Sequence, residues 1–355
     1  MTGGGDCPGL NAVIRAVAKA AQSKYGLEVW GIEDGYLGLI ENRMRQLRPH
    51  DVSGILTIGG TILGTSNTAD PFKYLVRKNG GTEFADVSEQ CIENAKSHGL
   101  DALICIGGDG TMTTAAKFAK MGLPIMGVPK TIDNDLVGTD VTFGFDTAVN
   151  TATEAIDKIH TTASSHHRIM IVEVMGRYAG WIALYAGVAG GADIILMPEF
   201  PYSLEKIEQC VYNRASHGKR FSIVCVAEGA KEKGGKMVVG NHVKNSPDPI
   251  RLGGIANKLQ YDIQEKTRIE TRAVILGHIQ RGGTPTPYDR VLATNFGYTA
   301  ISLLMEEEVK NHLVVLKENK FTSVPLSQIA GKIKNVPRDH GLIKAALAIK
   351  TSFGV

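Results

Sequence analysis

The sequence predicts an α/β protein made of two three-layer α/β/α sandwich lobes with mainly parallel sheets. Three observations support this prediction. The 355 residues exceed the length of one typical domain. Short apolar runs recur along the chain, each bounded by glycine or a charged cluster, and segments with helical periodicity lie between them. Such alternation is typical of a buried sheet covered by helices on both faces.

The expected strands and helices are short and alternate along the chain. Six apolar runs predict buried parallel strands, at residues 102–106, 125–128, 169–174, 192–197, 222–228 and 273–278. Four segments with helical periodicity predict helices, at residues 11–21, 111–121, 146–160 and 180–189. By contrast, residues 229–254 are rich in Gly, Lys, Asn and Pro, which indicates an exposed excursion.

The composition argues against several kinds of partner. Lys plus Arg number 39 against 36 Asp plus Glu, and a formal charge of +3 is too small to favour nucleic acid or a membrane surface. The five cysteines lie far apart and form neither a zinc-ligand spacing nor a disulfide framework. No signal-peptide pattern occurs at the N-terminus, and no window approaches the roughly 18 apolar residues of a membrane span. We therefore expect a cytoplasmic protein.

Polar residues and glycines follow the predicted strands. Ligands of open parallel sheets bind beyond the carboxyl ends of the strands, so these residues are the candidates for a site. The segments concerned are GGDGT at 107–111, PKTIDND at 129–135, MGRYAG at 175–180, Glu228, and HIQRGG at 278–283. One or two such segments are ordinary turns, but so many together predict a ligand site.

Two glycine-rich loops are candidate phosphate-binding loops. Residues 3–15, GGGDCPGLNAVIR, lead into a predicted helix, whose N-terminus would present backbone N–H groups to an anion. They match neither the dinucleotide-binding nor the Walker pattern, so a plain tight turn remains an alternative. In GGDGT, Asp109 precedes a helix expected to start near Thr111 and could hold Mg²⁺ against a phosphate chain; an Asx-type turn is the alternative.

The PKTIDND segment has the residue types that phosphoryl transfer to a sugar hydroxyl requires. A carboxylate must take the proton, a metal must bridge phosphoryl oxygens, and cations must offset the transferring charge. Asp133, Asp135 and Lys130 are of these types, and Asn134 between the two acids would direct them apart or cap a turn. A capped turn at the end of a strand is the alternative without function.

Several cations lie next to the remaining strands and would suit a sugar phosphate, because a phosphomonoester binds several forked donors. Glu228 could accept a sugar hydroxyl. Taken singly, each arginine is more often a surface charge than a ligand. The candidate cations are Arg168, Arg177, Arg272, His278 and Arg281.

Six segments follow one another along the chain: GGGDCPGLNAVIR, GGDGT, PKTIDND, SSHHRIMIVEVMGRYAG, MPE and LGHIQRGGTPTPYDR. In this order and spacing, the chain resembles the phosphofructokinase A family from residue 1 to about 300. The resemblance implies ATP-dependent transfer of a phosphoryl group to the 1-hydroxyl of fructose 6-phosphate, with Mg²⁺, in a homotetramer or homodimer with shared active sites. It implies a donor lobe of residues 1–144 and 280–330, and a fructose 6-phosphate lobe of residues 145–279 and 331–355.

The resemblance also implies a role for each matching residue. Asp133 matches the general base, with Asp135 and Thr131 beside the reacting groups, and Asp109 matches the magnesium ligand. Positions near the donor phosphates are Gly5, Gly108, Asp109, Gly110, Thr111 and Lys130. The fructose 6-phosphate pocket would be formed by Met175, Gly176, Arg177, Glu228, His278 and Arg281, with Arg168 and Arg272 reaching in from a neighbouring subunit.

This chain departs from the family pattern at several positions. Only Met1 and Thr2 precede Gly3, so we expect a central strand to be missing or truncated and the first glycine loop to be weakened. Asn67 stands where an arginine usually assists the donor phosphates, with Lys73 as the nearest substitute. The aligned effector positions read Pro49 and His160, which argues against regulation by the usual effectors.

Two further readings remain open. Gly110 resembles ATP users, whereas Lys130 resembles diphosphate users and a subset of ATP users, so a diphosphate-dependent phosphotransferase is the nearest alternative. A sugar-phosphate sensor without catalysis is the alternative of another class, and the intact acids Asp109, Asp133 and Asp135 argue against it. NAD kinase shares GGDGT but explains neither PKTIDND nor LGHIQRGG.

Overall fold

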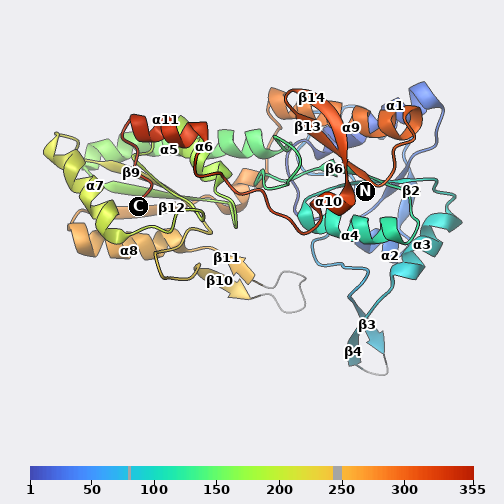
Figure 1. Cartoon of the computed structure of the whole chain (residues 1–355), viewed down its shortest axis with the longest axis horizontal. Helices are drawn as coiled ribbons and strands as arrows, with labels where there is room; N and C mark the ends of the chain where they lie inside the picture. The colour runs from blue at the N-terminus through green and yellow to red at the C-terminus, as the bar shows by residue number, and fades with distance from the viewer. Residues whose placement is uncertain (79–80, 243–249) are drawn as a thin grey trace.

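Two four-stranded sheets, one in each lobe, form the centre of the computed structural model, which describes residues 1–78, 81–242 and 250–355 (Figure 1). Helices cover both faces of each sheet. The prediction of two three-layer α/β/α lobes is therefore confirmed. We call them lobe I, which contains the N-terminus, and lobe II.

The sheet of lobe I has the strand order β14-β13-β6-β5. The first three strands in the chain run parallel, and β14 returns antiparallel to β13. One face packs against helices α1 and α9, and the opposite face packs against α2, α3, α4 and α10. The bounds are β5 (Leu103–Gly107), β6 (Ile125–Pro129), β13 (His312–Lys317), β14 (Lys320–Pro325), α1 (Leu10–Tyr25), α2 (Tyr36–Ile40), α3 (Ser88–Ser97), α4 (Asp109–Lys120), α9 (Pro287–Glu306) and α10 (Leu326–Ile329).

The sheet of lobe II is parallel throughout, in the order β12-β7-β9-β8. Its strands are apolar on both sides, because α5, α6 and α11 cover one face while α7 and α8 cover the other. The bounds are β7 (Ile169–Val174), β8 (Ile194–Leu196), β9 (Ser222–Ala227), β12 (Thr271–Ile275), α5 (Phe145–His166), α6 (Trp181–Ala189), α7 (Leu204–Ser216), α8 (Ile255–Thr267) and α11 (Gly341–Ala348).

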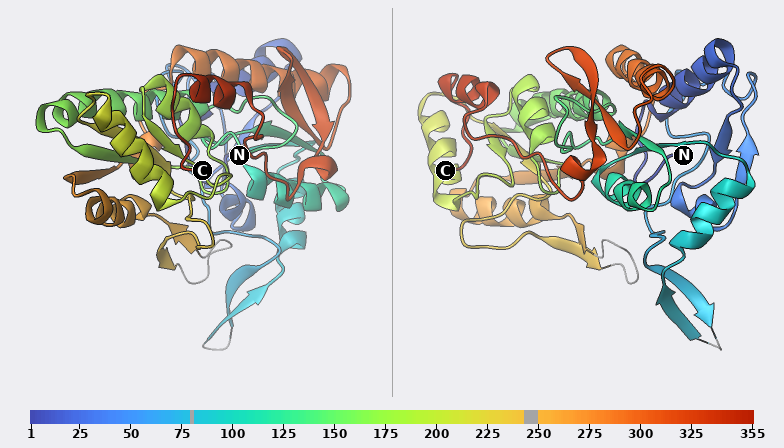
Figure 2. Two further views of the ribbon diagram at one scale, coloured as in Figure 1. Left: turned by 60° about the vertical axis from the view of Figure 1, so that its left-hand side comes forward. Right: turned by 45° about the vertical axis from the view of Figure 1, so that its right-hand side comes forward.

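Within the described residues, three two-stranded ribbons lie outside the main sheets. The ribbon of β3 (Tyr74–Lys78) and β4 (Gly81–Ala85) projects from lobe I, as both views of Figure 2 show. The pair β10 (Val239–His242) and β11 (Ile250–Leu252) falls in the predicted excursion at 229–254, of which residues 243–249 lie outside the described part. The third ribbon joins β1 (Trp30–Ile32) to β2 (Met44–Gln46).

Two predicted boundaries next to the candidate site differ from those of the structure. The strand predicted at 273–278 ends at Ile275, and His278 lies instead in a 3₁₀ helix, η1 (Gly277–Arg281). Gly277 has a positive φ of 50°, which bends the chain out of the sheet. Helix α4 begins at Asp109 rather than near Thr111, so the acidic side chain lies in the first helical turn, where the helix dipole favours it.

Residues 1–3 form a short N-terminal strand beside β5. Thr2 pairs with Ile106 in parallel, and the Gly3 N–H donates to the Ile106 carbonyl at 2.9 Å. Farther along this edge of β5, an apolar groove of about 570 Å³ separates β5 from β1. Apolar side chains from both strands and from α1 and α9 line it, among them Ile14, Ile32, Ile104 and Ile301.

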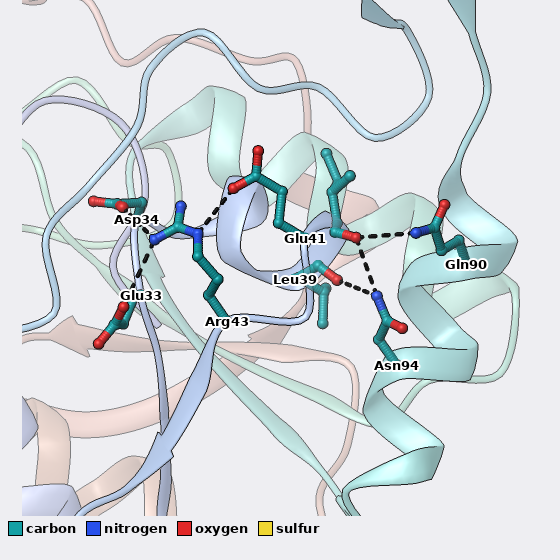
Figure 3. A network of polar contacts seen from close by, with 8 residues as sticks. Glu33, Asp34, Leu39, Glu41, Arg43, Gln90 and Asn94 are labelled. Atoms are coloured by element: carbon teal, nitrogen blue, oxygen red, sulfur yellow. Dashed lines mark hydrogen bonds and ion pairs between the residues drawn. The ribbon is translucent and has the colours of Figure 1, made fainter. Parts of the chain in front are cut away.

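A polar network fixes the chain between β1 and β2 (Figure 3). Arg43 donates to Asp34 at 2.7 Å and to Glu41 at 2.8 Å, and the Asn94 side-chain amide donates to the carbonyls of Leu39 and Ile40. The segment held in this way contacts the N-terminal strand, since a Cβ on Gly35 would lie 2.5 Å from the Thr2 carbonyl oxygen. The network therefore supports the loop that follows Thr2.

No helix within the described residues is long and apolar enough to cross a membrane.

Candidate active site

The first glycine loop, residues 3–9, follows the short N-terminal strand and leads into α1. The N–H groups of Gly3 and Gly4 donate to the carbonyls of Ile106 and Ser66, so they hold the loop itself rather than a ligand. Cations lie close to Gly5. The Lys130 ammonium donates to the Gly5 carbonyl, and a Cβ on Gly5 would lie only 2.8 Å from Nη1 of Arg281. The loop is therefore a suitable anion site chiefly through these two cations.

The GGDGT loop joins β5 to α4 next to that site. Asp109 Oδ1 accepts a hydrogen bond from the Gly331 N–H at 3.0 Å, and burial raises the pKa of this carboxyl. A Cβ on Gly110 would meet no atom within 4 Å, so open space lies beside it. Thr111 is buried, and its hydroxyl lies 2.8 Å from where a Cβ on Gly3 would be. Thr111 thus packs the two loops together.

Gly108 and Lys130 bring the GGDGT loop next to the end of β6. A Cβ on Gly108 would lie 3.3 Å from the Lys130 carbonyl oxygen, and the Lys130 N–H donates to the Gly107 carbonyl at 3.0 Å. Lys130 itself is buried. Burial lowers the pKa of its ammonium to about 8.

The turn at residues 131–135 carries the two acids of the PKTIDND segment. The Asp133 N–H donates to the Thr131 hydroxyl at 3.1 Å, and Asn134 takes a left-handed φ of 50°, a conformation that asparagine tolerates. Oδ1 of Asp133 is buried and has no hydrogen-bond partner among the described residues. Burial, with help from the neighbouring Asp135 charge, raises the pKa of Asp133 to about 7. Burial raises the pKa of Asp135 as well.

Lobe II contributes the residues that face this turn. Burial raises the pKa of Glu228, just beyond β9, to about 7, and the charge of Asp133 adds to the shift. Arg177 and Arg281 oppose the pKa shifts of both carboxyls, so each arginine lies within electrostatic range of Asp133 and of Glu228. The Arg177 loop lies against the loop after β9, because a Cβ on Gly229 would come within 1.9 Å of the Arg177 carbonyl oxygen.

The residues after β7 are held by a side chain that the sequence analysis did not select. The Met175 N–H donates to Oε1 of Gln280, whose side chain is fully buried in η1, at 3.3 Å. Gly176 adopts a φ of 134°, which favours glycine. His278 is exposed in η1, three residues before Arg281. Gln280 lies inside the IQRGG segment, next to the selected Arg281, and this position was the one sign in the sequence that it belongs to the site.

Arg168 and Arg272 do not join this cluster within one chain. Arg168 precedes β7 and Arg272 is the second residue of β12, so both lie toward the amino ends of parallel strands, about 20 Å and about 10 Å, respectively, from the carboxyl ends of their own strands. Both form ion pairs with Glu270, at 2.6 and 2.5 Å. Their assignment to the sugar-phosphate pocket of a neighbouring subunit stays a prediction.

The positions that depart from the family pattern have ordinary surroundings. Asn67 is exposed, one residue after Ser66, whose carbonyl accepts from Gly4. Lys73 places its ammonium 4.9 Å from the centre of the Phe84 ring on the β3–β4 ribbon, so this contact does not direct it to the glycine loop. The His160 ring lies 2.7 Å from the Gly190 carbonyl oxygen.

The acids suit a magnesium ion only together with a ligand. No group of three or more His, Cys, Asp or Glu side chains within the described residues could hold a metal by itself. Asp109 and Asp135 lie within electrostatic range of each other. Proteins commonly bind Mg²⁺ through one or two carboxylates plus substrate phosphates, and this pair fits that arrangement.

Together, the fold and the cluster define a two-lobed protein with a carboxylate-and-cation site at the carboxyl ends of its strands, as in phosphoryl-transfer proteins. The sequence profile described as Phosphofructokinase matches residues 1–304. The chain therefore belongs to the phosphofructokinase family.

Individual relatives cover nearly the whole chain. It is 53% identical to "ATP-dependent 6-phosphofructokinase 2" of Clostridium perfringens, over 99% of this chain and 97% of that protein. It is 49% identical to "ATP-dependent 6-phosphofructokinase" of Spirochaeta thermophila, over 100% of this chain and 96% of that protein. Among solved structures, Pichia pastoris phosphofructokinase in the T-state is similar with a TM-score of 0.79 and 35% identity, over 93% of this chain and 37% of that one.

Proposed function

We propose that this protein is an ATP-dependent 6-phosphofructokinase, which transfers a phosphoryl group from ATP to the 1-hydroxyl of fructose 6-phosphate in glycolysis. The names of relatives that match almost end to end support this activity. One structural observation carries the proposal. The buried Oδ1 of Asp133 has no hydrogen-bond partner among the described residues, and its carboxyl lies within electrostatic range of Lys130 in lobe I and of Arg177 and Glu228 in lobe II.

Asp133 is the proposed general base, which takes the proton of the attacking sugar hydroxyl. Its raised pKa suits that role, because a base is most effective when its pKa lies near the working pH. Asp135 and Thr131 hold the turn beside it. Asp109 is the proposed ligand of Mg²⁺, which would neutralise charge on the phosphoryl oxygens when bound.

Substrates bind on the two sides of this turn in our proposal. Donor phosphates lie against Gly5, Gly108, Gly110 and Lys130, and fructose 6-phosphate lies against Met175, Gly176, Arg177, Glu228, His278 and Arg281. Arg281 is close to both sides, since its guanidinium donates to the Asp6 carbonyl of the first glycine loop at 3.1 Å and its charge acts on Glu228.

The site is shared between subunits in this proposal. Arg168 and Arg272 of one subunit complete the sugar-phosphate pocket of another, in a homotetramer or homodimer that works in the cytoplasm. Each subunit divides into a donor lobe of residues 1–144 and 280–330 and a fructose 6-phosphate lobe of residues 145–279 and 331–355.

Diphosphate is the alternative donor, and Lys130 is the observation that favours it. A lysine is a flexible point charge that can serve the terminal phosphate of either donor, so it discriminates weakly. Gly110 has open space where an aspartate would add bulk and negative charge. We therefore expect ATP to be preferred.

Parallel assays of one purified sample with MgATP and with Mg-diphosphate test the donor. We expect kcat/KM with ATP to exceed that with diphosphate at least about tenfold, which corresponds to roughly 1.4 kcal/mol. Gly110→Asp should abolish the use of ATP, and Lys130→Gly should leave it measurable. A preference of the unmodified protein for diphosphate would contradict the steric argument. Binding of fructose 6-phosphate without turnover on either donor would instead identify a sensor.

A further inference from the structure

Lys334 lies where the chain crosses from lobe I to lobe II, between α10 and α11. This crossing runs beside the turn that carries Asp133 and Asp135. Ile333 pairs with Leu136 in an antiparallel bridge, and the Lys334 N–H donates to the Asp135 carbonyl at 2.7 Å. The backbone of the crossing segment is therefore attached to the acidic turn.

The side chain of Lys334 makes three further contacts with the same region. Its ammonium donates to Oδ1 of Asn134 and to the carbonyls of Thr139 and Asp140, each at 3.0 Å. An ammonium has three N–H donors, so these acceptors use all of them. Burial lowers the pKa of this ammonium to about 8, and the charges of Asp135 and Asp140 oppose the shift.

Asn134 is the residue through which this arrangement acts. It is buried and left-handed, and its Oδ1 also accepts a hydrogen bond from the Thr142 N–H at 3.1 Å. The conformation of Asn134 sets the directions of the acids on either side of it. Lys334 thus fixes the residue that separates the proposed base from its neighbour.

Lys334 is also attached to lobe II. The Trp181 indole N–H, at the start of α6, donates to the Lys334 carbonyl at 2.8 Å, and the ammonium lies 5.3 Å from the centre of a Trp181 ring. Nearby, the Val336 N–H donates to Glu199, which also accepts from the Gly180 N–H. The crossing segment is thus held by the start of α6.

We propose that Lys334 is a positioning residue for phosphoryl transfer, which holds the Asp133–Asp135 turn of lobe I in a fixed orientation relative to α6 of lobe II. The proposal rests on the proposed function of that turn. A carboxylate displaced by about 1 Å can cost on the order of 10² in rate, so the effect belongs to turnover rather than to substrate binding.

The test compares Lys334→Met with Lys332→Met, two residues earlier on the same segment, where the side chain is exposed. We expect Lys334→Met to lower kcat about 10- to 100-fold while the Kd of fructose 6-phosphate changes less than about twofold. The Lys332 variant should match the unmodified protein. Equal losses in both variants, or an unchanged kcat in Lys334→Met, would overturn the proposal.

A second measurement does not depend on activity. Hydrogen exchange of the backbone amides at 131–142 should accelerate in Lys334→Met and not in Lys332→Met. If the unmodified protein fails to phosphorylate fructose 6-phosphate, the proposed function fails, whereas unchanged exchange in Lys334→Met contradicts positioning by itself. If Lys334→Met does not fold, Lys334→Gln replaces it in both measurements. Its amide can still donate to Asn134, so we expect a smaller decrease in kcat.

Discussion

At the scale of single residues, Asp133 carries the strongest prediction. Asp133→Ser should lower kcat by about 10² to 10⁴ and leave the Kd of fructose 6-phosphate roughly unchanged, because the variant loses the base but keeps the pocket. Steady-state kinetics and direct binding measure the two quantities. Turnover close to that of the unmodified protein would show that another group takes the proton.

The raised pKa of Asp133 also predicts a pH dependence. A general base works only when ionised, and burial raises the pKa of this carboxyl to about 7, so kcat/KM should rise with pH up to about 7 and then level off. Glu228 has a similar pKa, so the control is Glu228→Gln. That variant should bind the sugar phosphate more weakly yet retain the rise. If the rise disappears in Glu228→Gln, Glu228 is its source.

At the scale of secondary-structure elements, Asp289 joins α9 of lobe I to the start of α5. Its buried carboxylate accepts from the N–H of Gly144 at 2.9 Å, the N–H of Thr147 at 2.8 Å and the Thr147 hydroxyl at 2.6 Å. In Asp289→Asn, an NH₂ group replaces one of the two accepting oxygens, so at least one of these donors faces another donor. The substitution should lower the free energy of unfolding by about 1.5 to 3 kcal/mol, as measured by urea denaturation. Thr147→Ser keeps the hydroxyl that donates to Asp289, so it should lower the free energy of unfolding by less than Asp289→Asn does. An equal or larger decrease would show that packing, rather than these hydrogen bonds, supplies the stability.

The elements also show how far the sequence could be interpreted. Apolar runs identified all six predicted strands, because buried parallel strands need apolar residues on both faces. The end of the last one was missed at Gly277, where a positive φ rather than hydrophobicity ends the strand. Arg168 and Arg272 were assigned to the site only through the resemblance, as residues of a neighbouring subunit, and a single chain does not test that assignment. Lys334 was missed because it lies in no motif itself and is about 200 residues away from its acceptors, of which Asn134 belongs to the PKTIDND segment.

At the scale of the whole molecule, the separation of Arg168 from Asp133 predicts complementation between subunits. Arg168→Ala and Asp133→Ser chains are each expected to be inactive. Mixed and reassembled, they should regain some activity, because a site with Asp133 from one chain and Arg168 from the other is complete. Asp133→Ser mixed with Arg177→Ala is the matched control, since both residues belong to the same chain's half of the site, and should show no recovery. No recovery in verified mixed oligomers of the first pair would contradict shared sites.

The groove between β1 and β5 has a consequence for handling the protein. The groove encloses about 570 Å³ with a mostly apolar lining, and an exposed apolar surface of this kind favours association between copies of the chain. Partly unfolded copies expose further apolar surface when the sample is warmed or concentrated, and this surface can pack into the groove. Precipitation of this protein should therefore begin in lobe I, and charged substitutions along the rim of the groove are the first choice for improving its solubility.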